Sequence, residues 1–205
     1  MKVLIINDSP RVGGNTALAV NEMTKVFAEE GIEADVMQIG AKDIRGCIAC
    51  GKCSELGKCI FDDEVNEAAK KFEEADGLVI ASPVYYASAN GTLISFLDRL
   101  FYSSNFDMSM KVGASVVCAR RGGCSATFDE LNKYFTISNM PIASNQYWNS
   151  IHGRAKGEAD LDEEGKQTMR ILARNMSFLM KSIALGKEKF GLPKKENRVA
   201  TNFIR

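Results

Sequence analysis

The feature that most constrains the fold is an alternation of short apolar runs with longer amphipathic stretches. The first run is residues 2–7 (KVLIIN), and a helical pattern follows from Asn15 or Thr16 to about Glu30. A short apolar run without polar alternation is typical of a strand buried on both faces. Strands that alternate with helices predict an α/β fold, in which helices cover both faces of a parallel sheet.

The same alternation continues along the chain, which at 205 residues is long enough for one complete domain. We expect that domain to cover residues 1–185, with a cysteine loop inserted at 46–60 and a basic, polar C-terminal extension at 186–205. A stripe of Met and Leu in the last helix, beginning at Leu161, is expected to be core. Further strands are predicted at 32–39, 76–86, 111–119 and near 140–144, and further helices at 64–75, 91–102, about 124–136 and 158–185.

Composition excludes several classes of partner. Lys and Arg number 26 and so do Asp and Glu, so no net positive field favours nucleic acid or an anionic membrane. No apolar run reaches the length of a membrane span, and the N-terminus lacks the pattern of a signal peptide. A cytoplasmic protein is therefore expected, and in that compartment thiols stay reduced, which disfavours disulfides.

In a parallel sheet of this kind, ligands bind along the edge where the strands end. The loop after the first strand, residues 7–16 (NDSPRVGGNT), offers two hydroxyls, an amide, the Arg11 guanidinium and a flexible glycine pair. A helix N-terminus attracts anions, so the loop predicts a phosphate site, although a simply capped helix would also explain it. The loop has neither the Walker A pattern nor G-x-G-x-x-G, which disfavours ATP and a Rossmann-bound dinucleotide.

Two further loops on this edge carry unusual residues. Residues 82–91 (SPVYYASANG) place two tyrosines beside small residues, an arrangement that suits a flat ring ligand, although the loop could instead pack beneath the following helix. Residues 118–123 (CARRGG) could bring backbone N–H groups against a planar ring, which alone is a weak signal.

Together, SPRVGGNT, SPVYYAS and ARRGG resemble the NADPH-dependent FMN reductase family, and the resemblance covers about residues 1–150. It implies a three-layer, flavodoxin-like fold with a five-stranded sheet in the order 2-1-3-4-5, and a homodimer or homotetramer. In that family the first loop binds the FMN phosphate, the second contacts the isoalloxazine ring and the third borders it. The residues that match these roles here are Ser9, Arg11, Gly14, Asn15 and Thr16, then Pro83, Val84, Tyr85 and Tyr86, then Arg120 and Gly122.

The resemblance also implies redox chemistry that needs no protein nucleophile. His152 is the only histidine, so histidine-based nucleophilic catalysis would rest on one side chain, which is expected at the surface or an interface. A bound flavin would carry the chemistry while the protein orients it. NAD(P)H would serve as co-substrate by stacking on the exposed flavin face.

Four of the six cysteines lie within fourteen residues, in the pattern C-x2-C-x2-C-x5-C formed by Cys47, Cys50, Cys53 and Cys59. Iron–sulfur clusters often use three cysteines at this close spacing and a fourth further away. Structural zinc sites more often use two separated pairs. An iron–sulfur cluster, free redox-active thiols, and zinc or a disulfide all stay open. Cys118 and Cys124 are expected to be small buried or partly exposed residues.

The motif matches that of the iron–sulfur flavoproteins, a subgroup of the same family that holds a 4Fe–4S cluster in such a loop. Other relatives carry similar cysteines and a following Asp pair, here Asp62 and Asp63, and bind FMN alone.

The leading hypothesis is an FMN-dependent oxidoreductase that takes electrons from NAD(P)H or a reduced carrier to a small molecule, such as a quinone, an azo or nitro compound, flavin or oxygen. The alternatives are an electron carrier between ferredoxin-like partners and a zinc-holding redox sensor. The loop follows a strand, so we expect the cysteines at the same edge as the flavin.

Overall fold

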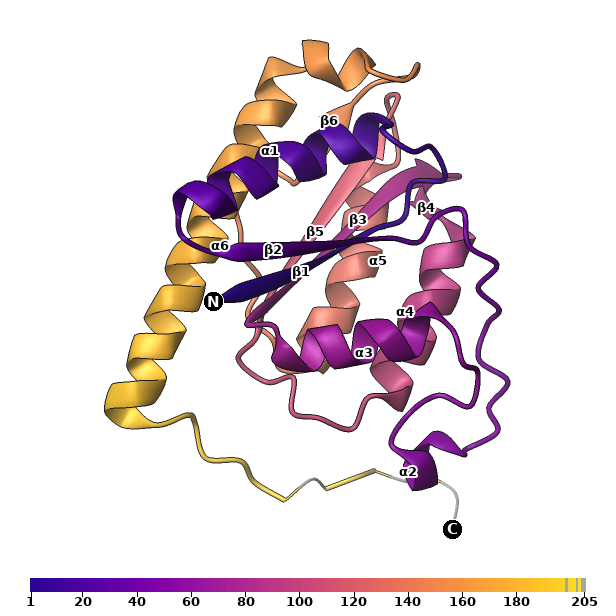
Figure 1. The fold of residues 1–205 in the computed structure, drawn as a ribbon, viewed down its shortest axis with the longest axis vertical. Helices are drawn as coiled ribbons and strands as arrows, with labels where there is room; N and C mark the ends of the chain where they lie inside the picture. Colours follow the sequence, from indigo (N-terminus) through magenta and orange to yellow (C-terminus); the bar gives the residue numbers. More distant parts are fainter. Residues whose placement is uncertain (198, 202, 204–205) are drawn as a thin grey trace.

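The computed structural model describes residues 1–197, 199–201 and 203 (Figure 1). In chain order, its elements are β1 (Lys2–Asn7), α1 (Asn15–Glu29), β2 (Glu33–Gln38), α2 (Cys53–Leu56), α3 (Glu64–Glu74), β3 (Gly77–Tyr85), β4 (Ser88–Ala89), α4 (Gly91–Ser103), β5 (Val112–Ala119), α5 (Cys124–Ile137), β6 (Ser150–His152), the 3-10 helix η1 (Glu158–Leu161) and α6 (Glu163–Phe190).

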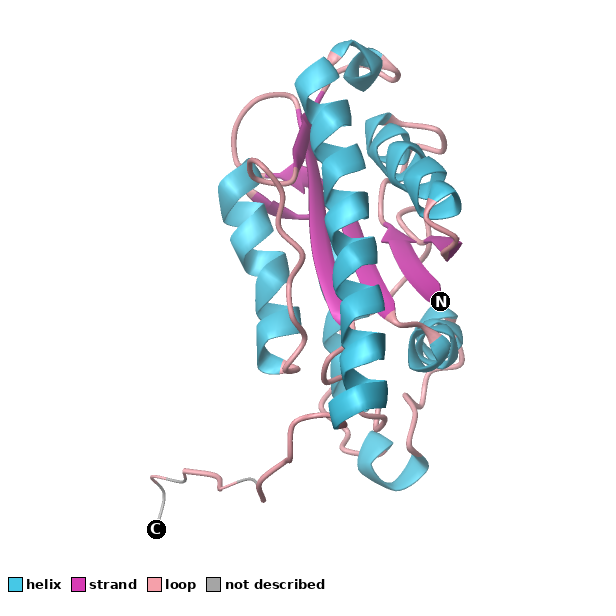
Figure 2. Cartoon of the chain, turned by 90° about the vertical axis from the view of Figure 1, so that its left-hand side faces the viewer, coloured by secondary structure: helices cyan, strands magenta, loops and turns pink. Residues whose placement is uncertain are grey.

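The sheet is parallel, and its strands lie in the order β2-β1-β3-β5-β6. The two-residue strand β4 pairs antiparallel with the end of β3 and lies outside this order. Helices α1 and α6 cover one face and α3, α4 and α5 cover the other, so that the sheet forms the middle of three layers (Figure 2). This confirms the predicted flavodoxin-like arrangement and its order 2-1-3-4-5 for the successive parallel strands.

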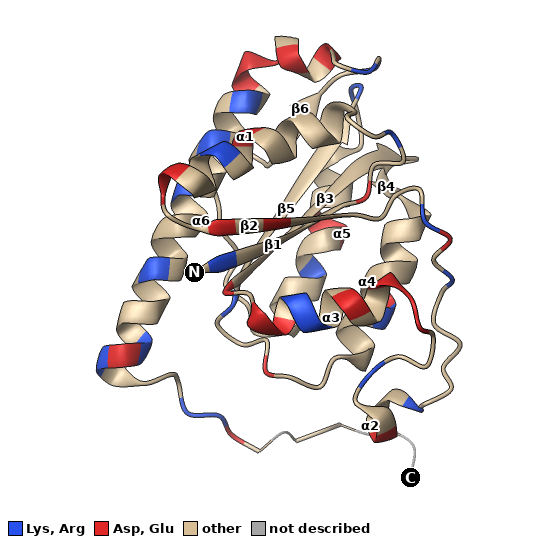
Figure 3. Ribbon diagram, in the orientation of Figure 1, with Lys and Arg blue, Asp and Glu red and all other residues tan. Residues whose placement is uncertain are grey.

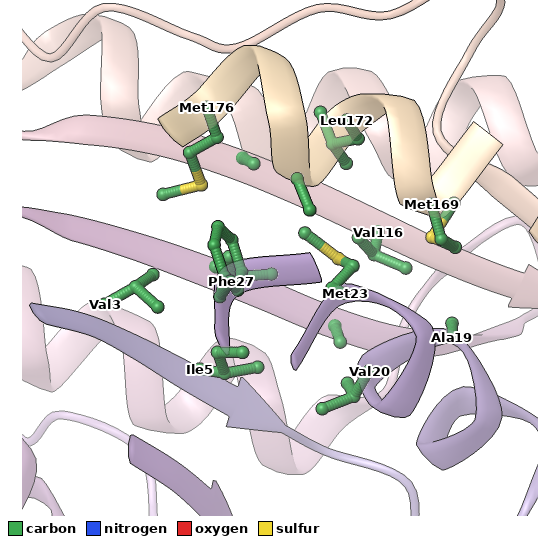
Figure 4. Close-up of a cluster of buried hydrophobic side chains, with 14 of the residues drawn as sticks. Val3, Ile5, Ala19, Val20, Met23, Phe27, Val116, Met169, Leu172 and Met176 are labelled. Atoms are coloured by element: carbon green, nitrogen blue, oxygen red, sulfur yellow. The ribbon is translucent and has the colours of Figure 1, made fainter. Parts of the chain in front are cut away.

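Strand β1 lies between β2 and β3 and is buried on both faces, and its successive side chains point to opposite sides of the sheet. Val3 and Ile5 pack against Met23 and Phe27 of α1 and against the Met and Leu side chains of α6 (Figure 4). The alternate residues, with Leu4 among them, join a second core under α3, α4 and α5. Complete burial of one such side chain stabilises the fold by about 1.5–3 kcal/mol.

The predicted fifth strand is in a different place. Residues 140–144 form only an isolated bridge, between Ile142 and Gly113, and the fifth parallel strand is β6, which begins at Ser150. With three residues, β6 is too short for a recognisable apolar pattern. Its position is set by pairing with the end of β5.

The last helix also differs from its prediction of 158–185. The Asp162 side chain caps its start by accepting a hydrogen bond from the backbone N–H of Gly165 at 2.9 Å, so α6 begins at Glu163. Leu161 consequently lies outside the helix and is 83 % exposed rather than core. The helix ends at Phe190, beyond the boundary expected at residue 185.

Charged residues of both signs are interspersed along α3 and α6 (Figure 3). Within the described residues, no helix combines the length and the apolar character that crossing a membrane requires.

Candidate functional site

A cleft opens at the carboxyl ends of β1, β3 and β5. The three loops that the sequence singled out meet there, together with a segment after β6 that it did not. The lining residues are Ser9, Arg11, Asn15 and Thr16 from the first loop, Pro83, Val84 and Tyr85 from the second, Cys118, Ala119 and Arg120 from the third, and Gly153 and Arg154 after β6.

Three of the predicted residues are not among those that line the cleft. Gly14 is the N-cap of α1, and a Cβ there would lie 3.0 Å from the Arg11 carbonyl oxygen, so the position favours glycine. Tyr86 is completely exposed between β3 and β4, and Gly122 is exposed in the third loop.

The N-terminus of α1 is suited to an anion. No side chain caps it, so its first N–H groups are open to a ligand, and the helix dipole adds to their attraction. Beside it, the backbone N–H of Arg11 donates to Ser9 Oγ at 3.3 Å, which holds the loop in a tight turn around the cleft. This is the geometry expected of a phosphate site.

The Asn15 side chain fastens the first loop to the segment after β6. Its Oδ1 accepts hydrogen bonds from the backbone N–H groups of Gly157 and Ala159, and its Nδ2 donates to the Ala155 carbonyl at 2.9 Å. Arg11 Nη1 also donates, to the Arg154 carbonyl at 3.3 Å. The Asn15 amide is thus engaged in shaping the cleft, and the phosphate contact expected of it stays a prediction.

The second loop is held in an unusual conformation. Tyr86 and Ala87 both have positive φ, 51° and 60°. Residues other than glycine adopt this backbone conformation at a cost of about 1–3 kcal/mol each. The Glu130 carboxylate of α5 holds the turn by accepting from Ser88 Oγ and from the Ala89 backbone N–H, both at 2.9 Å. Such strain is common at ligand sites, and here it presents Tyr85 to the cleft.

Asp8 is a buried carboxyl group that the sequence analysis did not single out. It is fully buried at the end of β1, and neither of its carboxyl oxygens has a hydrogen-bond partner among the described residues. Burial raises its pKa to about 7, and the nearby Asn90 amide opposes this only in part. Folding therefore favours the protonated form of Asp8 near neutral pH.

We expect Asp8→Asn to stabilise the protein above pH 7 and to have little effect near pH 4. As the pH rises from 3.8 to about 7, only the unfolded chain loses this proton, so the free energy of unfolding falls. The slope is about 1.4 kcal/mol per pH unit, and the total is about 4 kcal/mol. Urea unfolding of wild type and of Asp8→Asn at pH 5 and pH 8 measures how the free energy of unfolding of each changes with pH. The exposed variant Asp43→Asn is the control, and equal pH dependence in wild type and Asp8→Asn would contradict the interpretation.

The four loop cysteines line one small cavity, with Phe61, Arg99 and Tyr102 among its other walls. Within the described residues, no group of three or more His, Cys, Asp or Glu side chains is gathered closely enough to hold a metal ion. A four-iron cluster binds each cysteine to a different iron, so its ligands surround a larger volume than those of a single ion. The four thiols line the same cavity, and four thiolates are the set of ligands that such a cluster takes.

Arg99, which the sequence analysis missed, organises this loop. Its side chain is 1 % exposed and forms a bidentate ion pair with Asp63, with Nη1–Oδ2 and Nη2–Oδ1 distances of 2.6 and 2.8 Å. Its Nε donates to Cys59 Sγ at 3.3 Å, and its Nη1 donates to the Arg45 carbonyl. One guanidinium on α4 therefore holds both ends of the cysteine loop.

The cysteine cavity does not lie beside the cleft, which corrects the expectation from topology. After β2 the chain runs past α4 towards α2 (Figure 1). The cavity is lined by Arg99, Tyr102 and Ser103 from the last turns of α4. The first turn of α4 follows the second cleft loop. At a rise of about 1.5 Å per residue, the eleven steps from Gly91 to Tyr102 separate the two places by about 16 Å along the helix. The loop is long enough to leave the edge of the sheet, which the strand order alone could not show.

The parallel order β2-β1-β3-β5-β6, with a ligand cleft where the strands end, defines a flavodoxin-like protein. Residues 1–154 match the family described as NADPH-dependent FMN reductase, and the chain belongs to that family.

Similarity to individual proteins supports this assignment. The chain is 35% identical over 191 residues to an iron-sulfur flavoprotein of Methanocaldococcus jannaschii, covering 89% of this chain and 99% of that protein. Among solved structures, it is similar to RosB with a bound 8-demethyl-8-formylriboflavin-5'-phosphate (TM-score 0.71, 18% identity, covering 100% and 94% of the two chains). It is also similar to a flavodoxin from the domain Archaea (TM-score 0.59, 13% identity, 88% and 99%). At these identities, the solved structures support the fold alone.

Proposed function

We propose that the chain is an FMN-dependent oxidoreductase that moves electrons from NAD(P)H or a reduced carrier to a small acceptor such as a quinone, an azo or nitro compound, flavin or oxygen. The observation that carries the proposal is the meeting of three family-specific loops at one cleft. The open N–H groups of α1, with Ser9, Arg11 and Thr16, would hold the FMN phosphate. Pro83, Val84 and Tyr85 would lie along the ring, with Arg120 at its border. Bound FMN would supply hydride and single-electron chemistry.

We also propose that Cys47, Cys50, Cys53 and Cys59 hold a 4Fe–4S cluster. The four side chains line one cavity, and the relative from Methanocaldococcus jannaschii is named an iron-sulfur flavoprotein. A cluster there would supply single-electron transfer. Hydrogen bonds to the sulfurs from the Arg99 guanidinium and from the Ala49 backbone N–H would favour its reduced form.

One observation favours the second hypothesis, an electron carrier between ferredoxin-like partners. Cys47 and Cys50 are exposed, about one helix length from the flavin cleft, so a partner could reach the cysteine loop without approaching the cleft. We also propose that the chain assembles as a homodimer or homotetramer.

The decisive experiment is an anaerobic purification with the visible spectrum, FMN, iron, sulfide and zinc measured on one sample. We expect one FMN per chain, with iron and sulfide in the ratio of a 4Fe–4S cluster, and weaker binding of riboflavin because it lacks the phosphate. Fast bleaching of the flavin by NADPH would support the reductase, and fast reduction only by ferredoxin would support the carrier. A protein that binds no FMN would contradict both, and stoichiometric zinc without iron would indicate the redox sensor.

A further inference from the structure

Cys124, His152 and Asp162 lie in a row beside the cleft, although they come from three different elements. Cys124 is the first residue of α5, His152 is the last of β6, and Asp162 is the N-cap of α6. Cys124 Sγ lies 3.7 Å from His152 Nε2, and His152 Nδ1 lies 3.4 Å from Asp162 Oδ2. The order is that of a nucleophile, a base and a residue that orients the base.

The Asp162 carboxylate is fixed in place by backbone groups. Its Oδ2 accepts from the backbone N–H of His152 at 2.7 Å, and its Oδ1 accepts from the backbone N–H of Gly165. A carboxylate beside Nδ1 favours the imidazole tautomer that carries its proton on Nδ1. In that tautomer, Nε2 is an acceptor that faces the thiol.

The surroundings of Cys124 require such a base. Burial raises the pKa of its thiol, so the sulfur stays protonated at neutral pH and becomes a nucleophile only by giving up its proton. Once formed, the thiolate lies at the N-terminus of α5, where the helix dipole stabilises negative charge. A neighbouring acceptor and a favourable helix end thus act together on one sulfur.

A hollow next to the cleft lies against His152 and Asp162, two of the three residues of the row, although Cys124 itself does not line it. It is lined by His152 and Asp162 and by Arg120, Arg154 and Glu158. The Glu158 carboxylate is occupied, because it accepts from the backbone N–H groups of Arg154 and Ala155 at 2.6 and 2.8 Å. The charges of Arg154 and Arg120 contribute to lowering the pKa of this carboxylate, but within the described part of the chain neither guanidinium forms an ion pair, so both can still bind an anionic ligand.

We propose that Cys124 is a site of thiol–disulfide exchange with small disulfides that carry carboxylate groups. The S–H bond of Cys124 breaks and its proton passes to His152. The sulfur attacks the disulfide, one new S–S bond forms, and the old one breaks. The leaving thiolate takes the proton from His152, so Cys124 is oxidised to a mixed disulfide and the departing sulfur is reduced to a thiol. The carboxylates of the disulfide pair with Arg120 and Arg154.

The surroundings of Cys124 differ from those of the other cysteines, although Cys118 is close enough for the Cys124 charge to contribute to its raised pKa. Cys47, Cys50, Cys53 and Cys59 lie near the far end of α4. Cys118 is buried, its burial raises the pKa of the thiol to about 11, and the one histidine of the chain contacts Cys124 instead. The proposal therefore predicts selectivity for one cysteine, and it does not depend on the flavin or the cluster.

The test exposes the purified holoprotein to oxidised glutathione and maps the mixed disulfide by peptide mass spectrometry. We expect modification at Cys124, none at this peptide in Cys124→Ser, and a rate about 100-fold lower in His152→Ala, because general-base assistance is of this size. The neutral 2-hydroxyethyl disulfide should react more slowly, and this difference should shrink in high salt. Asp160→Asn, a change of a nearby exposed carboxylate, is the matched control and should keep the wild-type rate.

Added free imidazole distinguishes a general-base role of His152 from a merely structural one. Added imidazole should restore the reaction of His152→Ala and leave the wild-type rate unchanged. Circular dichroism and flavin content verify that the variant is folded. The proposal is overturned if Cys124 reacts no faster than Cys118, if His152→Ala keeps the wild-type rate, or if imidazole fails to restore the rate in the folded variant.

Discussion

Replacing Cys50 by alanine is expected to remove most of the iron from the protein and to leave FMN bound. Cys50 is exposed and lines the cavity with the other three cysteines of the loop, so its loss would leave three thiols for a cluster that needs four. None of these cysteines lines the flavin cleft. The two cofactors should therefore be lost independently.

Iron, sulfide and FMN are measured on anaerobically purified wild type and variant, together with the absorbance that a cluster adds to the flavin bands. Cys124→Ser is the matched control, because it also removes one thiol but lies outside the cavity, and it should keep its iron. Full iron content in Cys50→Ala would rule out this loop as the cluster site. Loss of FMN together with the iron would show that the cleft and the cavity are not independent.

The sequence predicted the meeting of the three loops at one cleft for a simple physical reason. In a parallel sheet, every loop that follows a strand begins at the same edge, so the loops that begin at Asn7, Ser82 and Cys118 had to meet once their strands were recognised. The strands themselves were recognisable because complete burial requires apolar residues throughout. Arg154 was missed because it follows β6, a strand too short to show this pattern.

The cysteine loop shows where such reasoning fails. A strand fixes where a loop begins, but a loop of more than twenty residues can leave that edge, and this one follows α4 to its far end. One feature of the sequence could have indicated that the cysteine loop packs against α4. Arg99 falls on the apolar face of its helix, three residues after Phe96, and a buried charge implies a buried partner. The row of Cys124, His152 and Asp162 had no such signal, because only the tertiary fold brings these residues together.

Replacing Arg99 by methionine is expected to destabilise the protein by about 3 kcal/mol, because it leaves the Asp63 carboxylate without its partner. At about 2–4 °C per kcal/mol for a domain of this size, the melting temperature should fall by about 6–12 °C. Anaerobic urea unfolding, followed by circular dichroism, measures the change. Lys52→Met, which removes one half of an exposed ion pair with Glu55 in the same loop, is the matched control and should cost less than about 1 kcal/mol.

A second substitution distinguishes an unpaired charge from lost packing. In Arg99→Met with Asp63→Asn, the oxygen that caps α3 is kept while the unpaired negative charge is removed. If the charge causes the damage, the double variant should be more stable than Arg99→Met alone. If the two are equally unstable, the contribution of Arg99 lies in its contacts with Phe61, Cys59 and the Arg45 carbonyl, and the guanidinium acts chiefly as the support on which the cysteine loop folds.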